Sequence, residues 1–114
     1  MHVPTRQQRV LLDSFARYSV ISGIVLCLGR ADLLVEEVDD GGMGSFKISY
    51  KTMGVSGMGV KFEPTLSGID SDGIPIYATL FLRNGIPSDV DVWKVDFSAT
   101  VEMPTDWRID PSIT

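Results

Sequence analysis

The strict alternation of apolar and polar residues between positions 46 and 51 constrains the fold more than any other feature. Phe46, Ile48 and Tyr50 are each followed by a lysine or a serine. Successive side chains of a β-strand point to opposite faces, so this segment presents one apolar face and one polar face. A strand of that kind belongs to a sheet that packs one face on a core and leaves the other toward water.

The same two-residue period extends through most of the chain after Arg30. Turn sequences rich in Asp, Asn and Gly separate the further strands that we expect, which lie at 33–38, 60–66, 76–82 and 89–98. One of these turns holds Asn84-Gly85, the dipeptide favoured in two-residue hairpins. The segment 54–59 contains three glycines and is expected to form a mobile loop.

The two last strands depart from simple alternation. The segment 76–82 is apolar on both faces, so either it is central and covered on both sides or its second face is a docking surface. In the segment 89–98 the apolar parity changes between Val92 and Trp93, which predicts a bulge there. We expect the remainder to be a tail that Trp107 packs against the core.

The N-terminal part has helical spacing. Thr5 and Gln8 have the spacing of a capping box, and Leu11, Phe15 and Tyr18 fall on one helical stripe, which predicts a helix from about residue 5 to 19. The segment 20–28 fits either a second short helix or a buried strand. The fold class that follows is α+β in a single domain, 1–114, with one or two N-terminal helices packed on a mostly antiparallel meander sheet of four to five strands.

The charge and cysteine content exclude several classes of partner. The formal net charge is −5 and the sequence pI is about 4.6, whereas nucleic-acid and anionic-membrane binders need a basic surface. We therefore expect neither nucleic acid nor membrane as a partner. Cys27 is the single cysteine, which fits a reducing compartment and predicts a cytoplasmic location. The apolar run 20–28 is too short to span a bilayer and is expected to lie in the core.

The sequence lacks the residue sets of the common enzyme chemistries. The only histidine is His2, which removes catalytic triads, histidine acid–base chemistry and most transition-metal sites. Neither glycine-rich stretch supplies a phosphate-binding loop. The turn 70–73 places glycine fourth and Phe81 twelfth, unlike a calcium loop, so a plain Asx turn is favoured over a Ca²⁺ or Mg²⁺ site. We expect no catalytic residue, no cofactor and no metal. The one alternative for a small enzyme is a set of paired carboxylates, Asp89 and Asp91, which Asp39 and Asp40 would approach if their strands are neighbours.

Two strings of residues carry a family resemblance. The segment 40–45, DGGMGS, directly follows a strand with an acidic end, and the segment 90–98 reads VDVWKVDFS. Together they resemble a family of small uncharacterised bacterial domains, which are similar in kind to stand-alone immunity proteins. The resemblance implies that the chain binds and neutralises a cognate toxin domain of a contact-dependent or polymorphic system, and it implies no catalytic residues.

An acidic face would suit such a role, because many such toxins are basic nucleases whose active sites hold phosphate. The residues that we expect to bind the partner are six aspartates near turns or strand starts and three aromatic anchors: Asp39, Asp40, Asp70, Asp72, Asp89, Asp91, Tyr77, Phe81 and Trp93. In the alternative interpretation the three aromatics cover the second face of the sheet beneath helices. A generic interaction or small-ligand-binding domain, homodimeric through the outer sheet face, is the second functional hypothesis, and the oligomeric state stays open.

Overall fold

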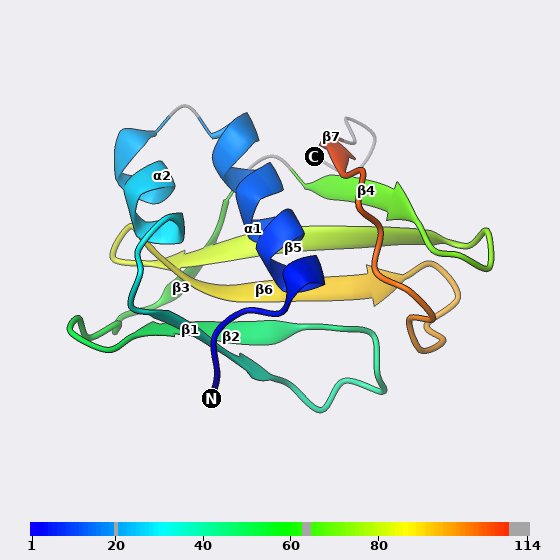
Figure 1. Ribbon diagram of the computed structural model, residues 1–114, viewed down its shortest axis with the longest axis horizontal. Coiled ribbons are helices and arrows are strands. Elements are labelled where there is room, and N and C mark those ends of the chain that lie inside the picture. The colour runs from blue at the N-terminus through cyan, green and yellow to red at the C-terminus, as the bar shows by residue number, and fades with distance from the viewer. Residues whose placement is uncertain (20, 63–64, 110–114) are drawn as a thin grey trace.

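The computed structural model describes residues 1–19, 21–62 and 65–109. Within them the chain forms two layers, with two helices lying on one face of an antiparallel sheet (Figure 1). The α+β class and the N-terminal position of the helices are as the sequence predicted. Among the described residues, no helix is long and apolar enough to cross a membrane.

Helix α1 spans Arg6–Tyr18 and begins at the predicted capping box. The Gln8 amide N–H donates to Thr5 Oγ1 at 3.2 Å, and the Thr5 amide donates to Gln8 Oε1 at 2.9 Å, so two backbone donors of the first turn are satisfied. The apolar stripe of α1 is buried, with Leu11 and Phe15 fully inaccessible. The segment for which the sequence left two alternatives is helical, because α2 spans Ser22–Leu28.

The sheet has seven strands, more than the four to five expected. They are β1 (Leu33–Glu37), β2 (Phe46–Tyr50), β3 (Gly59–Lys61), β4 (Leu66–Ile69), β5 (Pro75–Arg83), β6 (Ile86–Lys94) and β7 (Arg108–Ile109). Their order is β1-β2-β6-β5-β4-β7, and β3 pairs with β5 beyond the end of β4. The count differs because two strands replace the single one expected at 60–66: β3 overlaps its start and β4 begins at its last residue, and they pair with the two halves of the long β5. The C-terminal tail adds β7 to the edge of β4.

The hairpin between β5 and β6 turns at the predicted dipeptide, where Asn84 and Gly85 have positive φ values of 51° and 76°. The predicted bulge between Val92 and Trp93 is wrong. The register shift lies nearer the hairpin, between Phe81 and Leu82 of β5, and it leaves Ser88 of β6 without a partner across the ladder.

The apparent change of parity in β6 has a different cause. Val90 and Val92 point into the core, and Lys94 continues on the same face with no accessible surface, while Trp93 lies on the opposite face. A lysine therefore occupies an inward position of this strand. The core between the sheet and the helices also contains Trp107, which is fully buried and so confirms that this residue packs the tail.

Candidate functional site

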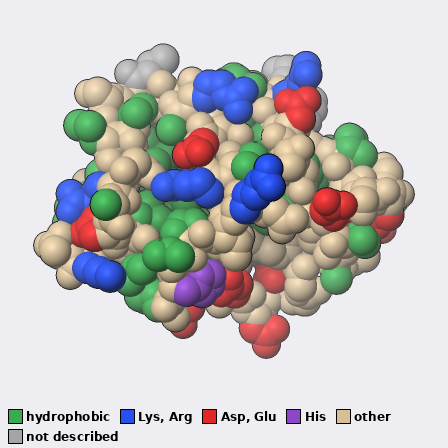
Figure 2. Space-filling model, in the orientation of Figure 1, with side chains coloured by type: hydrophobic (Ala, Val, Ile, Leu, Met, Phe, Trp, Pro, Cys, Tyr) green, Lys and Arg blue, Asp and Glu red, His purple; other side chains and the backbone are tan. Residues whose placement is uncertain are grey.

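Three connecting segments, 38–45, 70–74 and 94–103, meet at one end of the sheet, at the right of Figure 1. We call this region the acidic end. It contains six acidic residues and one lysine, whose formal sum of −5 equals the net charge of the whole chain. The other nine acidic and nine basic residues cancel. In Figure 2, which views the helix-bearing face, basic side chains lie over the helices, and the charged side chains visible at the right-hand end are acidic.

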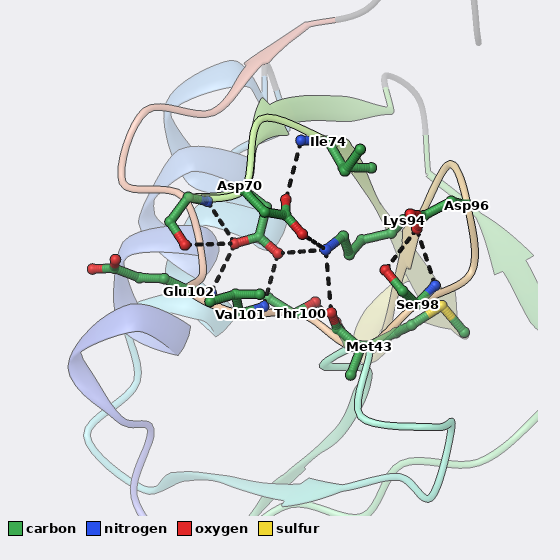
Figure 3. A network of polar contacts seen from close by, with 12 residues as sticks. Met43, Asp70, Ile74, Lys94, Asp96, Ser98, Thr100, Val101 and Glu102 are labelled. Carbon is green, nitrogen blue, oxygen red and sulfur yellow. Dashed lines mark hydrogen bonds and ion pairs between the residues drawn. The ribbon is translucent and has the colours of Figure 1, made fainter.

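The buried side chain of Lys94 joins the segments 70–74 and 94–103 to each other (Figure 3). Its Nζ lies 3.0 Å from Asp70 Oδ2 and 2.6 Å from Asp72 Oδ2, and it donates to the Ala99 carbonyl at 3.2 Å. The side chains of Lys94 and Asp70 are both inaccessible to solvent, and that of Asp72 is 36% exposed. A buried ion pair of this kind requires its remaining polar atoms to be satisfied. The three partners of Nζ fulfil that requirement.

Asp70 also holds the segment after β6 through backbone contacts. Its carboxylate accepts hydrogen bonds from the Val101 amide at 2.8 Å and the Glu102 amide at 2.7 Å, in addition to the Ser71 amide at 2.6 Å. Burial by itself would raise the pKa of Asp70, but these amide donors and Lys94 hold it well below its usual range. The carboxylate is therefore a fixed anion inside the domain.

The segment 38–45 is shaped by Asp40. Its carboxylate accepts from the amides of Met43 at 3.1 Å and Ser45 at 2.9 Å, so the loop folds around it. Burial opposes ionisation of Asp40, but hydrogen bonds from Ser45 and the loop amides lower its pKa overall. Gly44 has a φ of 110°, which favours glycine, and a Cβ there would also lie 2.9 Å from Met103 Cε, at the end of a side chain of the segment 94–103.

Thr100 attaches the same two segments to each other. Its amide donates to the Gly42 carbonyl at 3.0 Å, and its hydroxyl donates to the Met43 carbonyl at 2.5 Å. With the Lys94 contacts, these bonds fix all three segments relative to one another. The acidic end is therefore organised before any partner arrives, which lowers the entropy lost on binding.

Large apolar side chains stand exposed among these carboxylates. Phe97 is 73% exposed, Val101 68% and Val95 52%, and Val38 is 39% exposed at the margin. Apolar side chains on a rigid surface with a polar rim are the usual anchors of protein interfaces. The acidic end thus combines charge with apolar contact area.

The nine residues expected to bind a partner fall into two groups. Asp39, Asp40, Asp70 and Asp72 belong to the acidic end, although Asp70 is buried and reaches no partner directly. The others lie on β5 and β6 and point away from the helices, by strand parity: Tyr77, Phe81, Asp89, Asp91 and Trp93. The alternative in which helices cover these aromatics is wrong, because both helices pack on the opposite face.

On this outer face Tyr77 and Trp93 stack with ring centroids 5.6 Å apart. Beside them an open hollow of about 530 Å³ is bounded by Ile69, Pro75 and Tyr77 and, on its far side, by the segment 104–108. Arg83 lies 3.4 Å from Asp89, so that carboxylate is already paired within the chain. Asp91 is exposed and accepts from the Ser45 hydroxyl at 3.1 Å.

Sequence reasoning missed Lys94, Asp96, Phe97 and Glu102. The signal for Lys94 was present, since a lysine at an inward position of a strand requires a carboxylate partner. Within the part of the chain that the structure describes, no three His, Cys, Asp or Glu side chains are grouped so as to hold a metal ion. What the site offers is a preformed surface with fixed anions and apolar side chains.

These features define a class of protein, a two-layer α+β domain with a rigid acidic end formed by loops. Residues 21–104 match the family described as a domain of unknown function (DUF6984). The chain belongs to that family, since the match covers well over half of it. No curated protein and no solved structure matches the chain.

Proposed function

We propose that this domain acts in the cytoplasm as an immunity protein, which binds a basic toxin domain through the acidic end and neutralises it. The observation that supports the proposal is the location of the charge. The whole formal excess of −5 resides at one end of the sheet, while the remainder of the chain is balanced. Charge collected on one rigid surface steers an oppositely charged partner far better than the same charge spread evenly.

The mechanism of neutralisation would be occlusion. The active site of a nuclease is basic because it holds phosphate, and a carboxylate-bearing protrusion competes for the same cations. Asp39, Asp96 and Glu102 are exposed and can reach such a partner, whereas Asp70 and Lys94 stay inside and keep the loops in place. The exposed carboxylates would therefore contact the toxin, while the buried pair keeps the loops that carry them in position.

The proposal is tested with the purified chain and the catalytically inactivated C-terminal toxin domain encoded next to its gene. We expect a one-to-one complex, and co-expression of the chain should restore growth to cells that express the active toxin. The association rate should fall steeply as salt is raised, because the attraction acts over a Debye length of about 8 Å at physiological ionic strength. Absence of binding, or toxicity that persists on co-expression, would contradict the proposal.

Two charge-matched variants separate a local surface from overall charge. One carries Asp39→Lys, Asp96→Lys and Glu102→Lys at the acidic end. The control changes the net charge by the same amount elsewhere, through D13K, E36K and D106K, all at exposed positions. We expect the first variant to lower the association rate at least about tenfold at low salt and the control to lower it much less. Equal effects would show that only net charge matters.

A second candidate is binding of a small ligand in the hollow beside Tyr77. Its volume of about 530 Å³ lies within the usual range for ligand sites, and its wall includes one aromatic ring, that of Tyr77, and two prolines, Pro75 and Pro104. A thermal-shift screen with aromatic fragments tests this function. Any stabilisation should disappear in the variant Ser67→Trp, which fills the hollow.

A further inference from the structure

Phe97 is the most exposed aromatic side chain among the described residues. It is 73% exposed, more than any of the aromatics that sequence reasoning selected. The residue closes a turn in which its amide donates to the Lys94 carbonyl at 3.0 Å, directly after β6. The exposed ring therefore belongs to the same turn as Lys94, whose side chain forms the buried ion pairs of the acidic end.

The backbone of Phe97 is in an unfavourable conformation. Its φ is +59°, and among the described non-glycine residues only Asn84 shares a positive φ. Asparagine adopts the left-handed region readily, but a bulky aromatic residue there is uncommon and strained. Stability alone would favour glycine or asparagine at position 97 over an exposed phenylalanine. A residue that is costly to the fold and buries little surface calls for a role outside the fold.

The surroundings of Phe97 are fixed and negatively charged. The preceding carboxylate, Asp96, accepts from the Ser98 amide at 3.0 Å and from the Ser98 hydroxyl at 2.7 Å, which holds the turn rigid and lowers the pKa of Asp96. A second carboxylate, that of Asp72, lies 2.6 Å from the Nζ of Lys94, the residue at which the turn begins. The ring is thus an exposed apolar side chain that directly follows a fixed carboxylate.

We infer that Phe97 is the anchor of the acidic end and inserts into an apolar pocket whose rim carries lysine or arginine side chains of the partner protein. This inference rests on the proposed function and specifies the partner's binding surface. Charge complementarity selects the rim, because Asp96 beside the ring and the other exposed carboxylates of the acidic end would face its cations as the ring enters the pocket. The rigid turn means that little freedom is lost when the ring is immobilised.

The test uses Phe97→Asn, which suits the left-handed backbone and removes the ring. We expect its Tm to stay the same or to rise, while its Kd for the inactivated toxin domain rises at least about 30-fold, the effect of losing a hot-spot residue of about 2 kcal/mol. Phe97→Trp should keep Kd within a few-fold, because it retains an aromatic anchor. The matched control is Leu26→Gln, which removes a side chain 72% exposed on α2 and should leave Kd unchanged.

The outcomes separate this inference from the proposed function. If the wild-type chain binds and F97N binds equally well, the acidic end works without an anchor and the inference fails alone. A fall in Tm for F97N would show that the ring supports the fold, which also overturns it. If the wild-type chain is dimeric by light scattering and F97N is monomeric, the ring's pocket belongs to a second copy. Failure of the wild-type chain to bind overturns the proposed function itself.

Discussion

Replacing Asp70 by asparagine tests the network that organises the acidic end. The substitution keeps the shape of the side chain, but it removes the charge that faces Lys94 and turns one acceptor oxygen into a donor. Either orientation of the amide places its NH₂ group against a backbone donor, since Val101 and Glu102 each donate to a different carboxylate oxygen. The variant therefore loses an ion pair and a hydrogen bond in the interior.

The expected cost follows from burial. Removing one partner of a buried pair costs about 3–5 kcal/mol, and the remaining contact of Lys94 with Asp72 at 2.6 Å places D70N near the lower end, at about 3 kcal/mol. For a domain of this size that corresponds to a fall in Tm of about 12 °C. Thermal unfolding followed by circular dichroism measures the shift.

The control is Asp106→Asn, which breaks an exposed pair with Arg108 at 3.1 Å. A surface pair contributes at most about 1 kcal/mol, so this variant should unfold within a few degrees of the wild type. If D70N loses no more stability than D106N, the buried network does not hold the acidic end together. A double-mutant cycle with Lys94→Met adds a second check, because the two substitutions should be strongly non-additive if each leaves the other charge unpaired.

Further predictions concern the same end of the sheet. Because the pKa of Asp70 is lowered in the folded state, its contribution to stability is present above its unfolded-state pKa of about 3.9 and is lost as the pH falls toward the folded-state value. The urea midpoint of the wild type should therefore drop below about pH 4, and that of D70N should drop less. Gly44→Ala should cost about 1–3 kcal/mol in urea unfolding, because φ is 110° and Met103 must move. Ser45→Ala should cost about 1–3 kcal/mol by the same assay, because the buried Val92 amide loses its acceptor at 2.8 Å. An unchanged urea midpoint in G44A or S45A would contradict the packing described.

Local patterns were enough to predict much of the fold. Helix α1 followed from a capping box and an apolar stripe, and the alternation at 46–50 gave β2 correctly. Asn84-Gly85 predicted the hairpin because both positions need a positive φ. These features depend on neighbours within a few residues. The number of strands was missed because β3 and β4 stand where one strand was expected, each set by its pairing with a different part of β5, and because the tail adds β7.

The candidate site was predicted less completely, for a physical reason. Four of its aspartates were found because they occupy turn sequences, but the roles of two of them, Asp70 and Asp72, depend on a lysine more than twenty residues away. Trp93 suggested a bulge only because Lys94 was not considered as a core residue. Phe97 could not be singled out, since its exposure and its positive φ arise from a turn that is defined by the fold.

The concentration of charge gives this domain a negative pole at the acidic end, on an otherwise balanced chain. A molecule of that kind rotates in the field of a positive surface before it touches it. On an anion-exchange column it should therefore adsorb by one end and elute at a higher salt concentration than its net charge alone suggests. The two charge-matched triple variants, which have the same net charge, should then elute at different salt concentrations, and chromatography would map the pole without any partner protein.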